Sequence, residues 1–171
     1  MAQAEDLGLI ERADDRVDVR FERHYPRPVE TVWSALTEPA RLADWMGASY
    51  VEPHAGGRYE TMLDGLKPSS GHVLIWQPPR ILEIAWSNGH APDGIVRYDL
   101  TPEPAGTHLV FTHRGIPYRH AALMLPGWHV YLSHLSHVLA GTGPPDWEAT
   151  WRQMQTIYVE HYGLHGLTLE P

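Results

Sequence analysis

Alternating hydrophobic and polar residues predict that much of the chain forms β-strands. The first clear case runs from Val17 to about Tyr25, where Val17, Val19, Phe21 and Tyr25 share one face with Arg23. Such alternation is typical of an antiparallel strand with one buried face. Turn signals such as Gly56-Gly57, Pro78-Pro79 and Asn88-Gly89 separate the later candidates, so that the sequence predicts further strands over 58–63, 73–76, 81–86, 96–100 and 109–114.

Two short helices are predicted directly after the first long strand, within PVETVWSALTEPARLADWM from Pro28 to Met46. Pro28 and Pro39 suit first helical positions, where no amide donor is needed. Helical spacing turns one side of this pair inward, and that side is formed by Val29, Val32, Trp33, Leu36, Leu42, Trp45 and Met46.

A long amphipathic helix is predicted to begin at Pro126, after an irregular segment, and to end near Gly141 to Gly143. Its apolar face carries Trp128, Leu132, Leu135 and Leu139. Steps of about 100° per residue place His134 and His137 away from that face, so we interpret the pair as solvated and predict no metal site.

A final helix is predicted from Asp146, which is a suitable cap residue after two prolines. Its apolar stripe consists of Trp147, Trp151, Met154 and Tyr158. Either the rest of the chain or a second subunit must cover this stripe, and the second case predicts a homodimer through the C-terminal helix.

The order of elements predicts an α+β fold in which a curved antiparallel sheet of six to seven strands wraps around the long helix. We expect one domain over 1–171, with its core at about 7–141 and a helical extension at about 144–163. A curved sheet cannot pack its whole concave face against one helix, and the apolar space that remains is the usual form of a small-molecule site. The residues predicted to line it are Trp45, Met46, Tyr59, Trp86, Tyr98, Phe111, His113, Trp128, Tyr131 and Leu132.

Composition restricts the partners of this site. The chain has 171 residues, 43% of them hydrophobic, and a formal charge of −8, which disfavours binding to nucleic acid or to anionic membranes. Cysteine is absent, which excludes disulfides, thiolate nucleophiles and cysteine-bound zinc. The N-terminus has neither a basic start nor a long apolar run. We therefore expect a cytoplasmic protein with no cofactor and no bound metal.

His113 is the candidate for a functional side chain, because it shares a strand face with Leu109 and Phe111 near the strand end. A histidine there could act as general acid or base, or orient a polar ligand group. The alternative is a core histidine bonded to a backbone carbonyl or to Tyr131. No nucleophile with an evident base and no carboxylate pair is present on the predicted inner face, so no other catalytic residue is assigned.

Two arginines are weaker candidates. Arg23 has inward parity on the first strand, and Arg58 follows the double glycine, so either could meet a ligand carboxylate. The alternative for both is an ion pair on the sheet.

Several segments together resemble a known family. In order, they are PVETVWSALTEPARLADWM, AGGRY, GHVLIWQPPRILEIAW, GTHLVFTHRG and PGWHVYLSHLSHVLAG. They look like homologues of the activator of the heat-shock-protein ATPase, within the START-like, helix-grip superfamily called SRPBCC. The resemblance implies the helix-grip fold. It does not imply a ligand, because this superfamily includes lipid carriers, cyclases, hydroxylase subunits and cochaperone domains.

This chain departs from the family pattern at two places. Trp45-Met46-Gly47 stands where many relatives have a double tryptophan, and Arg27 stands where a small residue commonly precedes the helix-starting proline. Both departures predict a pocket mouth that differs from that of relatives.

Three functional hypotheses follow. The leading one is binding of a small hydrophobic molecule, aromatic or lipid-like, between sheet and helix. The alternatives are a cyclase or hydrolase type of enzyme that uses the same cavity, and an interaction module. The module would be a homodimer, or would bind a chaperone in a stress response.

Overall fold

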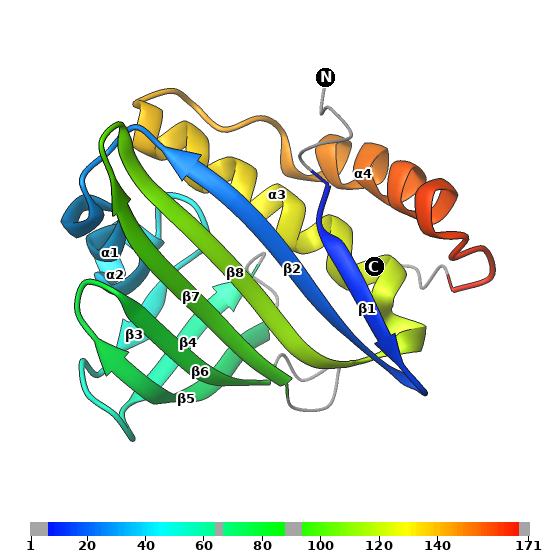
Figure 1. The fold of residues 1–171 in the computed structure, drawn as a ribbon, viewed down its shortest axis with the longest axis horizontal. Coiled ribbons are helices and arrows are strands. Elements are labelled where there is room, and N and C mark those ends of the chain that lie inside the picture. Colours follow the sequence, from blue (N-terminus) through cyan, green and yellow to red (C-terminus); the bar gives the residue numbers. More distant parts are fainter. Residues whose placement is uncertain (1–6, 64–66, 88–93, 168–171) are drawn as a thin grey trace.

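The computed structural model describes residues 7–63, 67–87 and 94–167, and within these ranges one antiparallel sheet of eight strands curves around a long helix (Figure 1). The strand order is β1-β2-β8-β7-β6-β5-β4-β3. The strands are β1 (Leu9–Ala13), β2 (Arg16–Tyr25), β3 (Ser49–Val51), β4 (Arg58–Leu63), β5 (Lys67–Gln77), β6 (Ile81–Ser87), β7 (Gly94–Glu103) and β8 (Gly106–Pro117). The helices are α1 (Val29–Thr37), α2 (Pro39–Leu42), a short 3-10 turn (Tyr118–His120), α3 (Ala121–Ala140) and α4 (Trp147–Tyr162).

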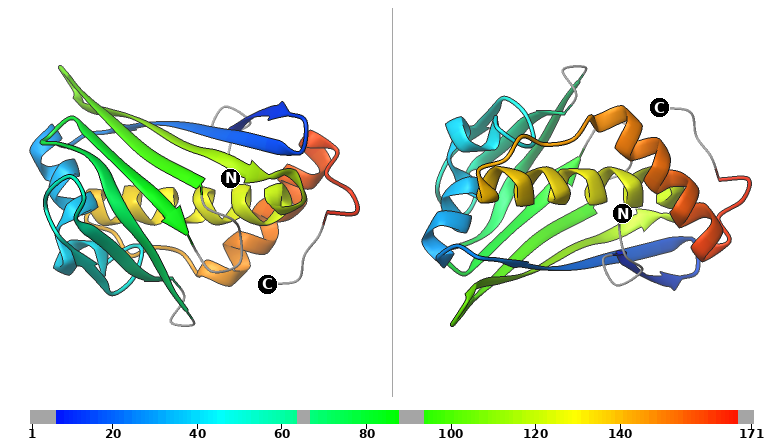
Figure 2. Two further views of the ribbon diagram at one scale, coloured as in Figure 1. Left: turned by 90° about the horizontal axis from the view of Figure 1, so that it is seen from below. Right: turned by 90° about the horizontal axis from the view of Figure 1, so that it is seen from above.

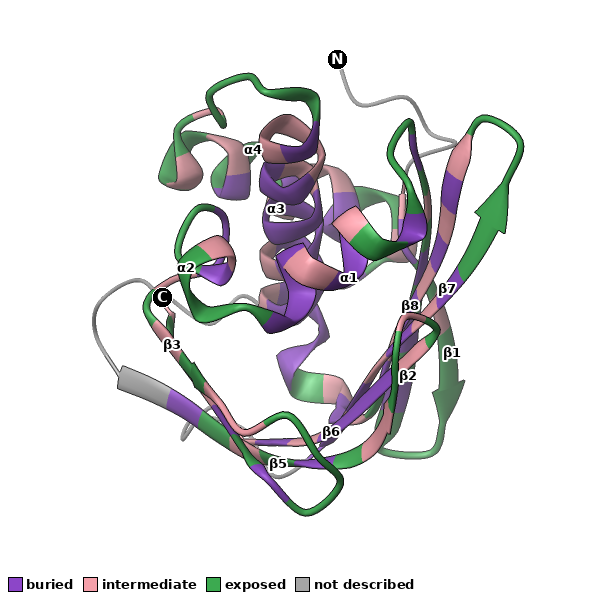
Figure 3. Ribbon diagram, turned by 90° about the vertical axis from the view of Figure 1, so that its left-hand side faces the viewer, coloured by how far each residue is buried: buried purple, intermediate pink, exposed green. Residues whose placement is uncertain are grey.

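This arrangement is the α+β fold predicted from the order of elements, and it agrees with the helix-grip fold that the family resemblance implies. Figure 2 shows α3 lying lengthwise along the concave side of the sheet, and Figure 3 shows buried residues concentrated on α3 and interspersed with more exposed residues along the strands. Alternation sets this burial, because every second residue of β2 is buried at Val17, Val19 and Phe21. The register also shifts between Val73 and Ile75 of β5, and an irregularity of this kind bends a strand.

The sheet has one strand more than the largest number predicted. The six strands predicted by residue range do not include β1 or the three-residue β3, which form the two edges. In β1, Leu9 is 57% exposed, and the strand continues as Ile10, Glu11, Arg12 and Ala13 with no buried residue, so no alternation marks it as a strand. An edge strand that few other residues cover has no buried face, so its sequence shows no alternation.

The predicted start of α3 was wrong. The helix begins at Ala121, and Pro126 lies inside it. Proline has no amide hydrogen, so the carbonyl of Ala122 loses its helical partner. Gln155 of α4 compensates, since its Nε2 donates to Ala122 O at 3.5 Å. The predicted end is confirmed, because Gly141 closes the helix with a left-handed φ of 76°.

Helices α1 and α2 confirm the predicted short pair, with one difference in detail. Pro28 occupies the cap position before α1, whereas Pro39 is the first residue of α2. Trp33 is 9% exposed and its ring contacts Trp76 of β5, with 5.2 Å between centroids, so it belongs to the core as predicted.

The apolar stripe of α4 is covered by the same chain. Trp151, Met154 and Tyr158 are each 4% exposed or less, and α4 packs beside α3 (Figure 2). The Tyr158 hydroxyl accepts from the amide of Gly8 at 2.7 Å, while the Tyr162 hydroxyl donates to Gly8 O at 2.8 Å. Three residues of the stripe that suggested a homodimer therefore lie within the fold, while Trp147 is half-buried, and the dimer itself stays a prediction.

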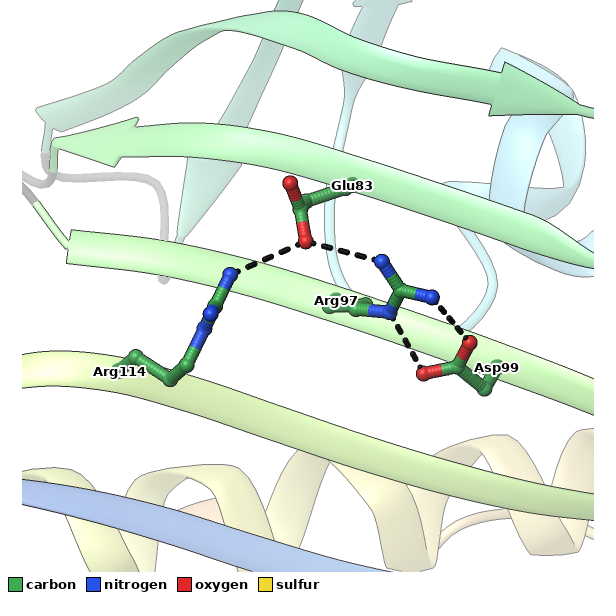
Figure 4. Close-up of polar contacts among 4 residues, drawn as sticks. All are labelled: Glu83, Arg97, Asp99 and Arg114. Carbon is green, nitrogen blue, oxygen red and sulfur yellow. Dashed lines mark hydrogen bonds and ion pairs between the residues drawn. The ribbon is translucent and has the colours of Figure 1, made fainter.

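A charged network crosses the face of the sheet turned away from α3 (Figure 4). Glu83 of β6 accepts from Arg97 of β7 at 3.2 Å and from Arg114 of β8 at 3.1 Å. Arg97 also forms a two-pronged pair with Asp99, at 2.7 Å for each contact. Since the Glu83 side chain is only 12% exposed, these bonds supply the polar contacts that its burial requires.

Candidate functional site

The ten residues predicted to line a cavity are all buried, each 7% exposed or less. Most of their rings surround Trp128 of α3. The ring centroid of Trp128 lies 4.5 Å from that of Phe111, 5.8 Å from those of Trp86 and His113, and 6.2 Å from that of Tyr131. Where the sequence predicts open space beneath the long helix, the Trp128 side chain fills the centre.

His113 is held as a neutral core histidine. Its Nδ1 accepts a hydrogen bond from Trp128 Nε1 at 2.9 Å, which leaves the proton of the neutral ring on Nε2. Burial lowers the pKa of His113 from its usual 6.5 to about 3. On the other side of the ring, an added Cβ at Gly94 would lie 2.3 Å from Nε2, so β7 can approach only because this residue is glycine.

These contacts favour the structural interpretation of His113 over a catalytic one. The lone pair that a general base would use is already engaged by the indole, and the low pKa leaves no imidazolium to act as an acid near neutral pH. The partner differs from the two that the sequence suggested, since Trp128 takes the place of a backbone carbonyl or Tyr131.

Two other predicted residues use their polar atoms to cap α1. The last carbonyls of a helix have no partner within it. Trp45 Nε1 donates to Ala35 O at 2.9 Å, and the Tyr59 hydroxyl donates to Leu36 O at 3.0 Å. Burial raises the pKa of Tyr59 well above its usual range, so the hydroxyl remains a donor. Their positions are thereby fixed relative to α1.

An open hollow of about 400 Å³ lies beside this cluster, where the turn after α2 meets β4, α3 and the start of α4. We call it the α2–α4 pocket. Figure 3 shows α2, β3 and α3 around this region. The lining residues are Ala43, Asp44, Trp45, Met46, Gly47, Ala48, Met62, Tyr131, His134 and Trp147. Three of the ten predicted site residues, Trp45, Met46 and Tyr131, therefore meet at it.

Gly47 fixes the shape of the turn that borders this pocket. Its φ is 142°, and an added Cβ would lie 2.2 Å from the carbonyl oxygen of Met62. Only glycine permits this conformation and this close approach of the turn to β4. The glycine after Trp45-Met46 therefore brings that pair and Met62 to the same hollow.

Sequence reasoning missed part of the lining. Trp147 was assigned only to the stripe of α4, yet it contacts Tyr131 with 6.0 Å between ring centroids and an interplanar angle of 53°. His134 was predicted to be solvated, but it is only 9% exposed. The helical wheel of α3 gave the wrong result because α4 and the turn after α2 cover a side that an isolated helix would expose.

The two arginine candidates do not line the α2–α4 pocket. Arg58 is exposed, lies 3.5 Å from a carboxylate oxygen of Glu52, and has its guanidinium 4.5 Å from the Tyr50 ring centroid. Arg23 NH1 donates to the carbonyl of Glu22 at 2.7 Å. Arg58 is thus an ion-paired sheet residue, as the alternative interpretation predicted.

A second hollow of about 580 Å³ lies where three turns meet. Five prolines border it, namely Pro26, Pro28, Pro79, Pro102 and Pro104. Arg27 also borders it and donates from Nε to Leu139 O at 2.6 Å. Arg27 therefore does not shape the α2–α4 pocket, contrary to the prediction, and no predicted ligand-binding residue lines this proline hollow.

Within the described ranges, no three His, Asp or Glu side chains gather as a metal-binding group. No helix in that part of the chain is long and apolar enough to cross a membrane.

Comparison with known proteins places the chain among relatives of the same fold. The family model described as Activator of Hsp90 ATPase homolog 1-like protein matches residues 26–140. The crystal structure of CalU16 from Micromonospora echinospora aligns with a TM-score of 0.71 and 25% identity, covering 88% of this chain and 92% of that one. A protein from Bordetella parapertussis aligns with a TM-score of 0.70 and 27% identity, covering 91% of both chains.

DynU16, a putative protein in the dynemicin biosynthetic locus, aligns with a TM-score of 0.69 and 25% identity, covering 79% of this chain and 51% of that one. No curated protein sequence matches the chain.

Proposed function

The chain belongs to the Activator of Hsp90 ATPase homolog 1-like family, and we propose that it binds a small hydrophobic molecule in the α2–α4 pocket. The observation that carries the proposal is the meeting of Trp45, Met46 and Tyr131 at one open hollow. Its volume of about 400 Å³ lies in the range of small-molecule sites, which are lined mainly by apolar and aromatic groups.

The chemistry of the site supports binding rather than turnover. His113 is neutral and engaged by Trp128, and the Tyr59 hydroxyl is used on α1. Ligand binding also agrees with the description of DynU16 as a putative protein in the dynemicin biosynthetic locus. The enzyme and chaperone-partner hypotheses stay predictions, since no further contact in the described residues favours them.

The proposal is tested by filling the pocket without removing any core side chain. Ala48 is exposed and lines the α2–α4 pocket, so Ala48→Phe places a ring in the hollow. The probe is N-phenylnaphthylamine, a neutral aromatic whose fluorescence rises in apolar surroundings. We expect the full-length protein to bind it and the Ala48→Phe variant to bind it at least about tenfold more weakly, a difference of about 1.4 kcal/mol.

Ala105→Phe is the matched control, because Ala105 is also exposed and lies on a turn, but it lines the proline hollow. It should leave probe binding unchanged. Loss of binding in Ala105→Phe with retention in Ala48→Phe would move the site to the proline hollow. If the wild-type protein binds no probe, and native mass spectrometry after incubation with the probe shows only the free chain, the proposal is wrong.

A further inference from the structure

We propose that the ligand of the α2–α4 pocket is an organic cation, such as an amine carried on a flat aromatic body. This inference rests on the proposed function and adds the charge of the ligand. It is drawn from the side chains that line the pocket.

The formal charge of the pocket is negative. Asp44 is the one Asp, Glu, Lys or Arg among the described residues that line it. Arg41, one turn earlier, directs its guanidinium toward Ser34 Oγ at 3.5 Å. The proline hollow differs, because Arg27 and Arg80 border it together with two glutamates. The described lining of the α2–α4 pocket therefore includes one acidic residue and no lysine or arginine.

The uncharged part of the lining also suits a cation. Trp45, Tyr131 and Trp147 are aromatic, and tryptophan and tyrosine rings attract cations through their electron-rich faces. The Tyr131 and Trp147 rings meet at 53°, so they form a corner rather than a flat stack. Met46 and Met62 add polarizable thioethers, which adapt to an aromatic body.

The same features disfavour an anionic ligand. A ligand carboxylate would bring a second negative charge to a pocket that Asp44 borders, and like charges repel. The net charge of −8 acts in the same direction at longer range, since it raises the local concentration of cations. A fatty acid or another anionic lipid is thus the wrong class for this pocket.

The test compares three ligands that share one ring system: naphthylmethylamine, naphthylmethanol and naphthoate, all as the α isomers. At about pH 8 the amine is a cation, the alcohol is neutral and the acid is an anion. Isothermal titration calorimetry at low salt with the full-length protein should rank them amine, alcohol, naphthoate. We expect the amine to bind about five- to tenfold more tightly than the alcohol.

Asp44→Asn isolates the carboxylate, and Glu160→Gln is its control, because Glu160 is an exposed acid on α4 outside the pocket lining. We expect Asp44→Asn to reduce the preference for the amine to about twofold, with alcohol affinity unchanged, and Glu160→Gln to keep the preference. Added salt should weaken binding of the amine but not of the alcohol.

An alcohol that binds as tightly as the amine, or an amine preference that survives Asp44→Asn, would overturn the assignment of charge while leaving the site intact. If the three ligands and the N-phenylnaphthylamine probe all fail to bind, both this inference and the proposed function are wrong.

Discussion

Acidification is expected to destabilise this fold through His113. The side chain is 3% exposed, and burial lowers its pKa from 6.5 to about 3. In the unfolded chain the imidazole takes up a proton near its ordinary pKa of about 6.5, whereas in the folded chain it stays neutral until about pH 3. Between these values the unfolded state binds more protons, so stability falls as the pH falls and is fully present above this window.

The size of the effect follows from the width of the window. One pKa unit corresponds to about 1.4 kcal/mol, so a single site of this kind loses about 1.4 kcal/mol for each pH unit well inside the window. From about pH 7 to about pH 5 the expected loss is about 2 kcal/mol. Small domains have total stabilities of roughly 5–15 kcal/mol, so this loss is large enough to measure.

His113→Asn provides the reference, because its amide oxygen can accept from Trp128 Nε1 but does not titrate. Urea unfolding is followed by circular dichroism at about pH 7, 6 and 5, at constant ionic strength. Other titrating groups act alike in both chains, so the stability advantage of the wild type should shrink by about 2 kcal/mol over this range. Parallel loss of stability in the two chains would refute a depressed pKa at His113.

Two further predictions concern packing and charge. Gly94→Ala should cost about 1–3 kcal/mol, because its Cβ would lie 2.3 Å from the His113 ring, whereas Gly143→Ala, with no atom within 4 Å, should change stability by less than about 0.5 kcal/mol. Chemical denaturation of both variants checks this, and equal costs would contradict it. Glu83→Gln should cost about 1–3 kcal/mol by weakening two charged hydrogen bonds, while Glu148→Gln, in an exposed pair, should cost at most about 0.5 kcal/mol. Thermal unfolding of both variants measures these costs. Equal losses in melting temperature would contradict a contribution from the Glu83 network.

Periodicity predicted the faces of the strands and helices well because side-chain direction follows directly from it. Phe111 and His113 were expected on the inner face of their strand, and both are buried there. Elements that lack a pattern were missed, as with the exposed edge strand β1. The preference of proline for the first turn of a helix also predicted the wrong start for α3. Pro126 lies inside the helix, and Gln155 donates to the Ala122 carbonyl that the proline leaves without a helical partner.

Hydrophobic periodicity predicts which side chains point inward, but it does not predict whether they leave a cavity between the sheet and α3. The sequence placed Trp128 correctly on the inner side of α3, but the indole fills the space that it was expected to line. Packing at crystal-like density leaves few voids, so open volume persists mainly where separate elements meet imperfectly. That is the situation at the α2–α4 pocket.

The composition of that pocket does not follow from family membership alone. The family model ends at residue 140, whereas Trp147, which contacts Tyr131, lies beyond it. Asp44 and Met46 come from a short turn within the matched region. A ligand preference governed by these positions would vary among proteins that share the sheet and the long helix. Ligand comparisons within the family therefore need to be matched on the turn after α2 and on the C-terminal helix, rather than on the conserved geometry of the fold.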